Sequence, residues 1–163
     1  MNVLLILLLT LFFQTEPLMV SSPDFEHEGK IPERFTCDGD DAHPTLHVSG
    51  IPAGTKSLAI IMEGPDVPLT TFNHWVVWNI EPTEVIEENS IVTASHGYNS
   101  IGKTNYSGPC PPAGVHRYFF KVYALNTKLD IEDDANKRKL ESAMEDHILA
   151  KGELMGWYQK KSE

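Results

Sequence analysis

Two runs of β-branched and aromatic residues constrain the fold of this chain more than any other feature. Residues 74–80 read HWVVWNI and residues 117–125 read RYFFKVYAL, and a third apolar run covers residues 58–62. All three are shorter than an average helix, and they are separated by segments rich in glycine, proline and asparagine, which favours strands. The near-continuous apolar character of residues 74–80 predicts a buried central strand.

Only one segment has convincing helical periodicity. Leu140, Met144 and Ile148 recur at four-residue spacing, after an acidic start at residues 133–134 that suits a helix N-terminus. We expect this helix to end at Gly152 and the chain to be extended after it. The pattern as a whole predicts a mostly antiparallel β fold with one late helix, closest to a sandwich.

The first residues of the chain differ from the rest. Residues 3–13 read VLLILLLTLFF, a run too short to span a bilayer, which takes about 20 residues, but long enough for the core of a secretory signal. No lysine or arginine precedes it, and no Ala-x-Ala site follows. We expect residues 1–17 to be a signal-like or tethering segment of an exported (periplasmic or secreted) or membrane-tethered protein, with a cytoplasmic protein as the alternative. Residues 18–163 are expected to form a single domain.

The charge of the chain argues against two classes of partner. Its 13 Lys plus Arg and 23 Asp plus Glu give a formal net charge of −10. A chain this acidic has no general electrostatic surface for nucleic acid or for an anionic membrane. Any anion that it binds must be held by local donors.

The two cysteines, Cys37 and Cys110, do not form a C-x-x-C motif. Thioredoxin-like chemistry and paired zinc knuckles are therefore unsupported. In an exported protein an even pair favours a disulfide, whereas in the cytosol both would be free thiols.

Polar residues beside prolines are the candidates for chemistry. Asp66 lies in GPDVP, His74 precedes WVVW, and His116 and Tyr118 follow the stiff GPCPP segment. Histidine ring nitrogens and a tyrosine hydroxyl are donors that suit phosphate or carboxylate, and an aspartate can fix a histidine tautomer or accept from an ammonium. The alternative for His74 is a satisfied core histidine.

Four segments together resemble a known family. PDVP, HWVVWNI, GPCPPAGVHRYFF and DHILAKGELMGWYQ follow one another in this order and are similar to the phosphatidylethanolamine-binding protein family, in its bacterial and archaeal Raf-kinase-inhibitor-like branch. The resemblance runs from about Val20 to the C-terminus. It implies an antiparallel Greek-key β-sandwich with one C-terminal helix and a small anion pocket at one end.

The resemblance also implies the site residues. Ligand-binding positions of the family match six residues here: Asp66, His74, Pro111, Pro112, His116 and Tyr118. A disulfide between Cys37 and Cys110 near the same rim is implied as well.

One position departs from the family pattern. The family loop D-P-D-A-P reads Gly64-Pro65-Asp66-Val67-Pro68 here, so the first aspartate is missing. Glu63, one place earlier on a strand, should point to the opposite face. We expect the contact to a ligand ammonium to be weakened, and binding of bare phosphate to be favoured by the smaller repulsion.

The resemblance therefore implies a non-enzymatic binding or regulatory protein with a pocket for phosphate or phospholipid-headgroup-type anions. Its expected partner is a small phosphorylated or carboxylate anion, with a kinase or a protease as candidate protein partner, a homodimer by family habit, and no cofactor or metal.

Three alternatives are weighed against this function. The first is a serine protease inhibitor acting through a surface loop. The second is a hydrolase using Ser107, which lacks a G-x-S-x-G elbow. The third is a metal site at His43 and His47, which lacks a third ligand.

Overall fold

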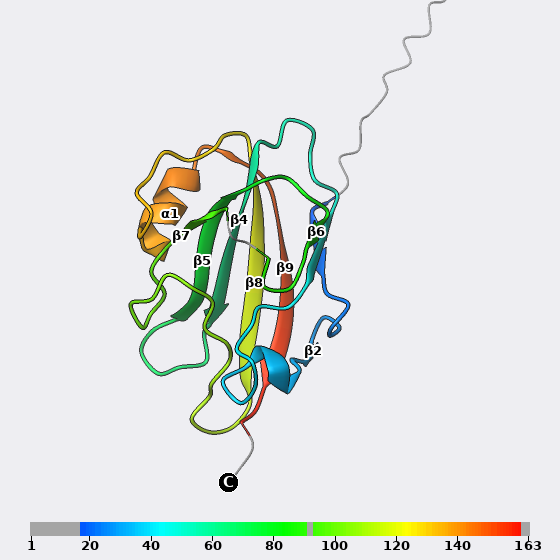
Figure 1. Ribbon diagram of the computed structural model, residues 1–163, viewed down its shortest axis with the longest axis vertical. Helices are drawn as coiled ribbons and strands as arrows, with labels where there is room; N and C mark the ends of the chain where they lie inside the picture. The colour runs from blue at the N-terminus through cyan, green and yellow to red at the C-terminus, as the bar shows by residue number, and fades with distance from the viewer. Residues whose placement is uncertain (1–16, 91–92, 161–163) are drawn as a thin grey trace, which may run out of the picture.

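The computed structural model describes residues 17–90 and 93–160 as two β-sheets with one α-helix (Figure 1). The smaller sheet contains β1 (Met19–Ser21), β3 (Leu46–Ser49) and β6 (Val85–Ile86). The larger sheet contains β2 (Gly29–Lys30), β4 (Ser57–Gly64), β5 (Phe72–Ile80), β7 (Ser95–His96), β8 (His116–Leu125) and β9 (Ile148–Tyr158). A 3₁₀ turn, η1 (Glu33–Phe35), and helix α1 (Lys137–Met144) complete the elements.

The predicted fold class is confirmed: the described part of the chain is mostly β, with one α-helix late in the sequence. The larger sheet has the order β2-β9-β8-β4-β5-β7. Its strands β4, β5 and β7 follow one another antiparallel, and β8 returns to lie antiparallel beside β4, which is the Greek-key order. The sheet is mixed rather than purely antiparallel, because β2 pairs parallel to β9.

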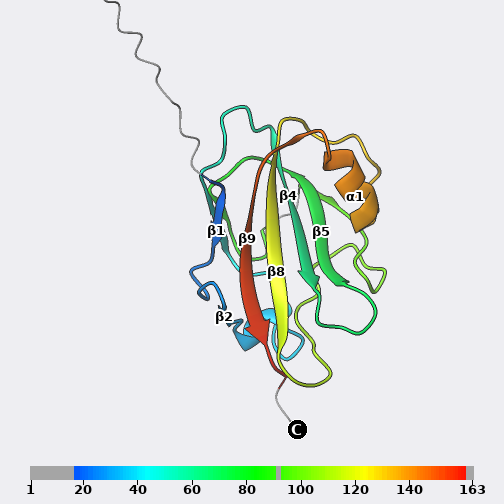
Figure 2. The same ribbon diagram turned by 180° about the vertical axis from the view of Figure 1, so that it is seen from behind.

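The larger sheet is buried on both faces near its centre. Alternate residues of β4, such as Ile60 and Met62, pack with the smaller sheet in one hydrophobic cluster, and Ala59 and Ile61 pack with α1 in a second. Figures 1 and 2 show α1 on one side of this sheet and β1 and β6 on the other side of the molecule. All eight residues of β4 are buried, as expected for a strand covered on both faces.

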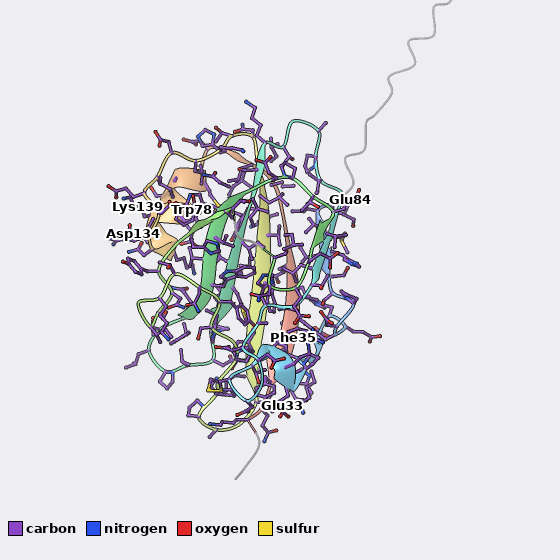
Figure 3. All side chains as sticks on the ribbon, viewed as in Figure 1. Glu33, Phe35, Trp78, Glu84, Asp134 and Lys139 are labelled. Atoms are coloured by element: carbon purple, nitrogen blue, oxygen red, sulfur yellow. A yellow bond between two sulfur atoms is a disulfide. The ribbon has the colours of Figure 1, made fainter. Side chains whose placement is uncertain are left out.

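The two clusters can be followed by their aromatic residues. Figure 3 shows Trp78 beside α1 and Phe35 on η1, toward the other end of the molecule. Trp78 belongs to the cluster under α1 and Phe35 to the cluster between the sheets, and both are fully buried. η1 therefore closes one end of the sandwich.

The predicted helix is shorter than its periodicity indicated. It begins after Asn136, whose side chain accepts a hydrogen bond from the Lys139 N–H, and it ends at Met144. Ile148 is the first residue of β9, where it pairs with Leu125. The prediction that Ile148 continues the helix and that Gly152 ends it was wrong, because residues 148–158 pair with β8 and such tertiary pairing overrides a weak local preference for helix.

Residues 1–16 of the apolar segment lie outside the described residues, so the expectation of a signal-like or tethering segment stays a prediction. In the described ranges, no helix is both long enough and apolar enough to cross a membrane. The expectation of a single domain from residue 18 likewise stays a prediction.

Candidate ligand-binding site

A cavity of about 410 Å³ lies where β4 ends and where β5 and β8 begin. Figure 1 shows the β4–β5 connection, η1 and the segment leading into β8 at this same end of the molecule. His116 and Tyr118 are the first and third residues of β8, so their side chains lie on the same face. His74, the third residue of β5, lines the cavity with them.

The hydrogen bond made by His74 defines its tautomer. Its Nδ1 lies 2.7 Å from the main-chain carbonyl oxygen of Ser107. Because a carbonyl oxygen only accepts, Nδ1 carries the proton, and Nε2 of the neutral ring is left as an acceptor. Burial lowers the pKa of His74, with the Ser107 bond acting in the opposite direction. A neutral His74 therefore offers one acceptor, and a protonated one offers a donor at the same atom.

Tyr118, which carries a hydroxyl, also lines the cavity. The residue is 2% exposed, and its ring meets the His74 ring edge to face, with the ring centroids 5.1 Å apart. Burial raises the pKa of Tyr118 further above physiological pH. Its hydroxyl therefore stays protonated and can donate to an anion.

The rim of the cavity is cross-linked. A disulfide joins Cys37 to Cys110, with their Cα atoms 5.4 Å apart, which is the pairing that the family resemblance implied. Pro111 and Pro112 follow Cys110 and line the cavity, where they present apolar rings without an N–H. The disulfide and the two proline rings together make a stiff rim.

Hydrogen bonds hold the same two segments together behind the rim. The Tyr106 hydroxyl donates to the Phe35 carbonyl oxygen at 2.9 Å, and the Gly108 N–H donates to Asp41 Oδ1 at 2.6 Å. A β-carbon on Gly108 would lie 2.4 Å from the Phe35 carbonyl oxygen, so only glycine fits between these backbones. Gly108, Pro111 and Pro112 therefore form part of the cavity wall, in addition to turning the chain before His116.

Asp66 is the predicted residue that does not line the cavity. Its carboxylate accepts from the Arg117 main-chain N–H at 2.8 Å, from Nε at 2.9 Å and from the terminal guanidinium nitrogen at 2.6 Å. These bonds to Arg117 lower the pKa of Asp66 to about 2. The structure gathers His74, Pro111, Pro112, His116 and Tyr118 around one cavity and engages Asp66 beside it. Their role in binding a ligand stays a prediction.

Sequence reasoning missed three apolar walls, which are provided by Val67, Phe72 and Ile101. Phe72 lies two residues before His74 on the same strand, so the two-residue period of a strand was a usable signal for it. Ile101 comes from a polar connection without any periodicity. Nothing local in the sequence marks it as a cavity residue.

The geometry bears on the hydrolase alternative. Ser107 lines the cavity, but His74 bonds to its main-chain carbonyl oxygen rather than to its hydroxyl. His74 is thus not placed as the base that a serine nucleophile needs.

The two histidines of the metal alternative have different surroundings. His43 is 5% exposed and stacks on Trp75, with the ring centroids 4.5 Å apart, while His47 is exposed on β3. In residues 17–90 and 93–160, no three His, Cys, Asp or Glu side chains are grouped to hold a metal ion.

Comparison with known proteins places this chain in a family. The family model described as phosphatidylethanolamine-binding protein matches residues 21–159. The chain belongs to the phosphatidylethanolamine-binding protein family. A UPF0098 protein of Methanothermobacter thermautotrophicus is 44% identical to it, over 83% of this chain and 95% of the relative. A UPF0098 protein of Archaeoglobus fulgidus is 46% identical over the same share of this chain, which spans only 49% of that relative.

Two crystal structures of this family have the same fold. One is a homologue of the phosphatidylethanolamine-binding proteins from Chlamydia trachomatis, with a TM-score of 0.85 and 37% identity, covering 89% of this chain and 99% of the other. The other is YbcL of E. coli, described as a member of the mammalian family, with a TM-score of 0.82 and 27% identity, covering 90% and 100%.

The buried histidines make the stability of this family member depend on pH. Burial lowers the pKa of both His43 and His74 below the ordinary value of 6.5. As the pH falls below about 6.5, the unfolded chain takes up protons that the folded chain does not, so the free energy of unfolding should decrease. Urea unfolding at pH 7.5, 6.5 and 5.5 measures this.

The carboxylates do not account for a loss in this pH window. Hydrogen bonds from Arg117 lower the pKa of Asp66 to about 2, so the stability that this carboxylate contributes should be kept above pH 5. A His43→Gln variant should lose part of the pH dependence. An unfolding free energy that stays constant or rises from pH 7.5 to 5.5 would contradict the prediction.

Proposed function

We propose that this protein is a non-catalytic binding protein whose cavity holds a small oxyanion of the phosphate or phospholipid-headgroup type. The observation that carries the proposal is the convergence of His74, His116 and Tyr118 on one cavity under a cross-linked rim. The His116 ring and the Tyr118 hydroxyl both supply donors, which suit phosphate or carboxylate oxygens. Membership of a family described by phosphatidylethanolamine binding supports the same ligand chemistry.

His74 completes the site in a way that depends on one proton. Its Nε2 is an acceptor in the neutral ring, so a phosphate that keeps one proton can donate its P–OH to Nε2. A fully ionised phosphate requires the ring to be protonated instead. In both cases the complex holds one shared proton, and binding should strengthen as the pH falls from 8 to 6.

The disulfide supports an exported location for this function. A bond between Cys37 and Cys110 persists in oxidising compartments and is rare where glutathione keeps thiols reduced. We therefore propose that the protein acts outside the cytoplasm, which agrees with the expected export role of the apolar segment at residues 1–17.

Titration with inorganic phosphate tests the anion site directly. We expect ¹⁵N and ¹³C chemical shifts of His74, His116 and Tyr118 to move at millimolar phosphate. His116→Ala should weaken binding by about tenfold or more, because a hydrogen bond to a charged group contributes roughly 1.5–3 kcal/mol.

His47→Ala is the matched control, because His47 is an exposed histidine on the other sheet. It should leave the affinity unchanged. Absence of shifts at millimolar phosphate, or an equal loss in both variants, would contradict the proposed function.

A further inference from the structure

The cavity presents donors but no carboxylate. The chain has 23 Asp plus Glu residues, yet none of those in residues 17–90 and 93–160 is among the residues that line the cavity. An acidic chain would place a carboxylate there by chance more readily than a basic one would. Each carboxylate that lies near the cavity has a hydrogen-bond partner elsewhere in the chain.

The two acidic residues nearest the end of β4 are both paired with basic residues of this chain, although Asp66 is near enough to interact through its charge with His116 and Tyr118. Asp66 is held by three donors of Arg117, which follows His116 and therefore lies on the opposite face of β8. Glu63 is buried, and its two oxygens accept from Lys121 and Lys137. Both lysines act to lower the pKa of Glu63, and its place next to Gly64 on the strand confirms that it faces away from the cavity.

The acidic residues behind the rim are engaged in the same way. Asp41 accepts from the Gly108 N–H at 2.6 Å, and Asp38 accepts from the Tyr158 hydroxyl at 2.6 Å. Each oxygen used there helps to close the end of the sandwich. Neither residue lines the cavity.

The position that would supply a carboxylate is a glycine. A β-carbon on Gly64 would lie 3.2 Å from Nε2 of His74 and 3.4 Å from the Tyr118 ring. A carboxylate carried by that β-carbon would therefore stand beside the donors of the site. Gly64 instead leaves this space open and uncharged.

Apart from Ser107, the side chains of the remaining walls are apolar. Val67, Phe72 and Ile101 line the cavity together with the rings of Pro111 and Pro112. A volume of about 410 Å³ is much larger than a bare phosphate group requires. A substituent attached to the phosphate would thus contact hydrocarbon and not a charged group.

We propose that this cavity selects phosphomonoesters with an uncharged, apolar substituent and discriminates against ligands whose substituent carries an ammonium group. This inference rests on the proposed function and concerns the ligand class of the same site. An ammonium held against these walls loses its hydration and gains no carboxylate, which is unfavourable, whereas a methyl group at the same place gains apolar contact.

A matched pair of ligands tests the inference. n-Propyl phosphate and O-phosphoethanolamine have the same number of heavy atoms and differ in a terminal methyl or ammonium group. Calorimetry or NMR titration of the purified protein at pH 6.5 should give a dissociation constant about tenfold lower for n-propyl phosphate. Equal or tighter binding of O-phosphoethanolamine would overturn the inference and leave the anion site intact. If neither ester nor inorganic phosphate bound, the proposed function would fail as well.

Substitution at Gly64 gives a second test. Gly64→Asp should raise the relative affinity for O-phosphoethanolamine by about tenfold, because the new carboxylate pairs with the ammonium. Gly64→Ala is the control that adds the β-carbon without the charge, and it should not favour the ammonium. Thermal unfolding of each variant shows whether it is folded. If Gly64→Asp does not fold, the ratio of the wild-type dissociation constants for n-propyl phosphate and O-phosphoethanolamine decides the question. A folded Gly64→Asp protein with an unchanged preference would overturn the role of Gly64.

Vesicles distinguish a lipid from a free metabolite as the source of the phosphomonoester. Phosphatidylcholine vesicles containing phosphatidic acid or phosphatidylethanolamine are sedimented with the protein. Co-sedimentation with phosphatidic acid that is lost in His116→Ala assigns a lipid ligand. Binding of n-propyl phosphate without co-sedimentation assigns a soluble ligand. Either of these two outcomes agrees with the inference. Preference for phosphatidylethanolamine would contradict it.

Discussion

Removal of the disulfide by Cys37→Ser with Cys110→Ser is expected to lower the free energy of unfolding by about 4 kcal/mol. The two cysteines are 73 residues apart, and closing a loop of this size removes roughly that much conformational entropy from the unfolded chain in the chain-entropy estimate. Urea unfolding of the double variant and of the oxidised protein gives the difference. Adding a reductant to the oxidised protein should produce the same loss.

The local structure of the rim should survive this change better than the global stability does. The Cys37 N–H donates to the Pro109 carbonyl oxygen at 3.2 Å, and the bonds from Tyr106 and Gly108 hold the same segments. Removal of the disulfide should therefore lower the affinity for phosphate by a smaller factor than it lowers the equilibrium constant for folding. A reduced protein with an unchanged unfolding midpoint would show that the cross-link does not constrain the unfolded chain.

Trp75→Ala is expected to cost about 4 kcal/mol of folding free energy. Trp75 is 1% exposed on β5 and belongs to the cluster between the two sheets. Its ring stacks on His43 at 4.5 Å and meets Tyr106 edge to face at 5.8 Å, measured between ring centroids. Truncating a buried tryptophan removes this contact and leaves a cavity, for which losses of roughly 3–5 kcal/mol are typical. Chemical unfolding measures the change.

Trp157→Ala is the matched control for this prediction. Trp157 is only partly buried on β9, where it lines a shallow apolar depression with Val115, Arg117 and Met155. Its removal exposes little new surface and should cost clearly less than Trp75→Ala. Equal losses in the two variants would mean that the burial of Trp75 does not determine the cost of its removal.

Three strands could be predicted from the sequence because their signals are local. The runs at residues 58–62, 74–80 and 117–125 contain the β-branched, aromatic and aliphatic residues that a strand with two covered faces requires. They correspond to β4, β5 and β8. The two-residue period of β8 also places His116 and Tyr118 on one face, without knowledge of any neighbour.

The end of the helix and the short strands could not be predicted in this way. Ile148 fits a helical period equally well, and its pairing with Leu125 depends on β8, more than twenty residues earlier. β6 and β7 have two residues each, too few to show a period. Strand pairing over such distances depends on tertiary contacts, which override weak local preferences.

Within the site, the sequence by itself determined which side chains could bind an anion. Residue type makes His74, His116 and Tyr118 candidate donors near a stiff turn, and the family resemblance adds the proline rim. Only the tertiary structure decided which acidic residues pair with other groups and do not line the cavity beside these donors. Whether Asp66 faces a ligand or Arg117, and whether Ser107 offers His74 its hydroxyl or its carbonyl oxygen, depends on side-chain directions set by strands that meet only in the folded chain. Hydrogen bonds act over about 3 Å, so these choices are made by packing and cannot be inferred from spacing along the chain.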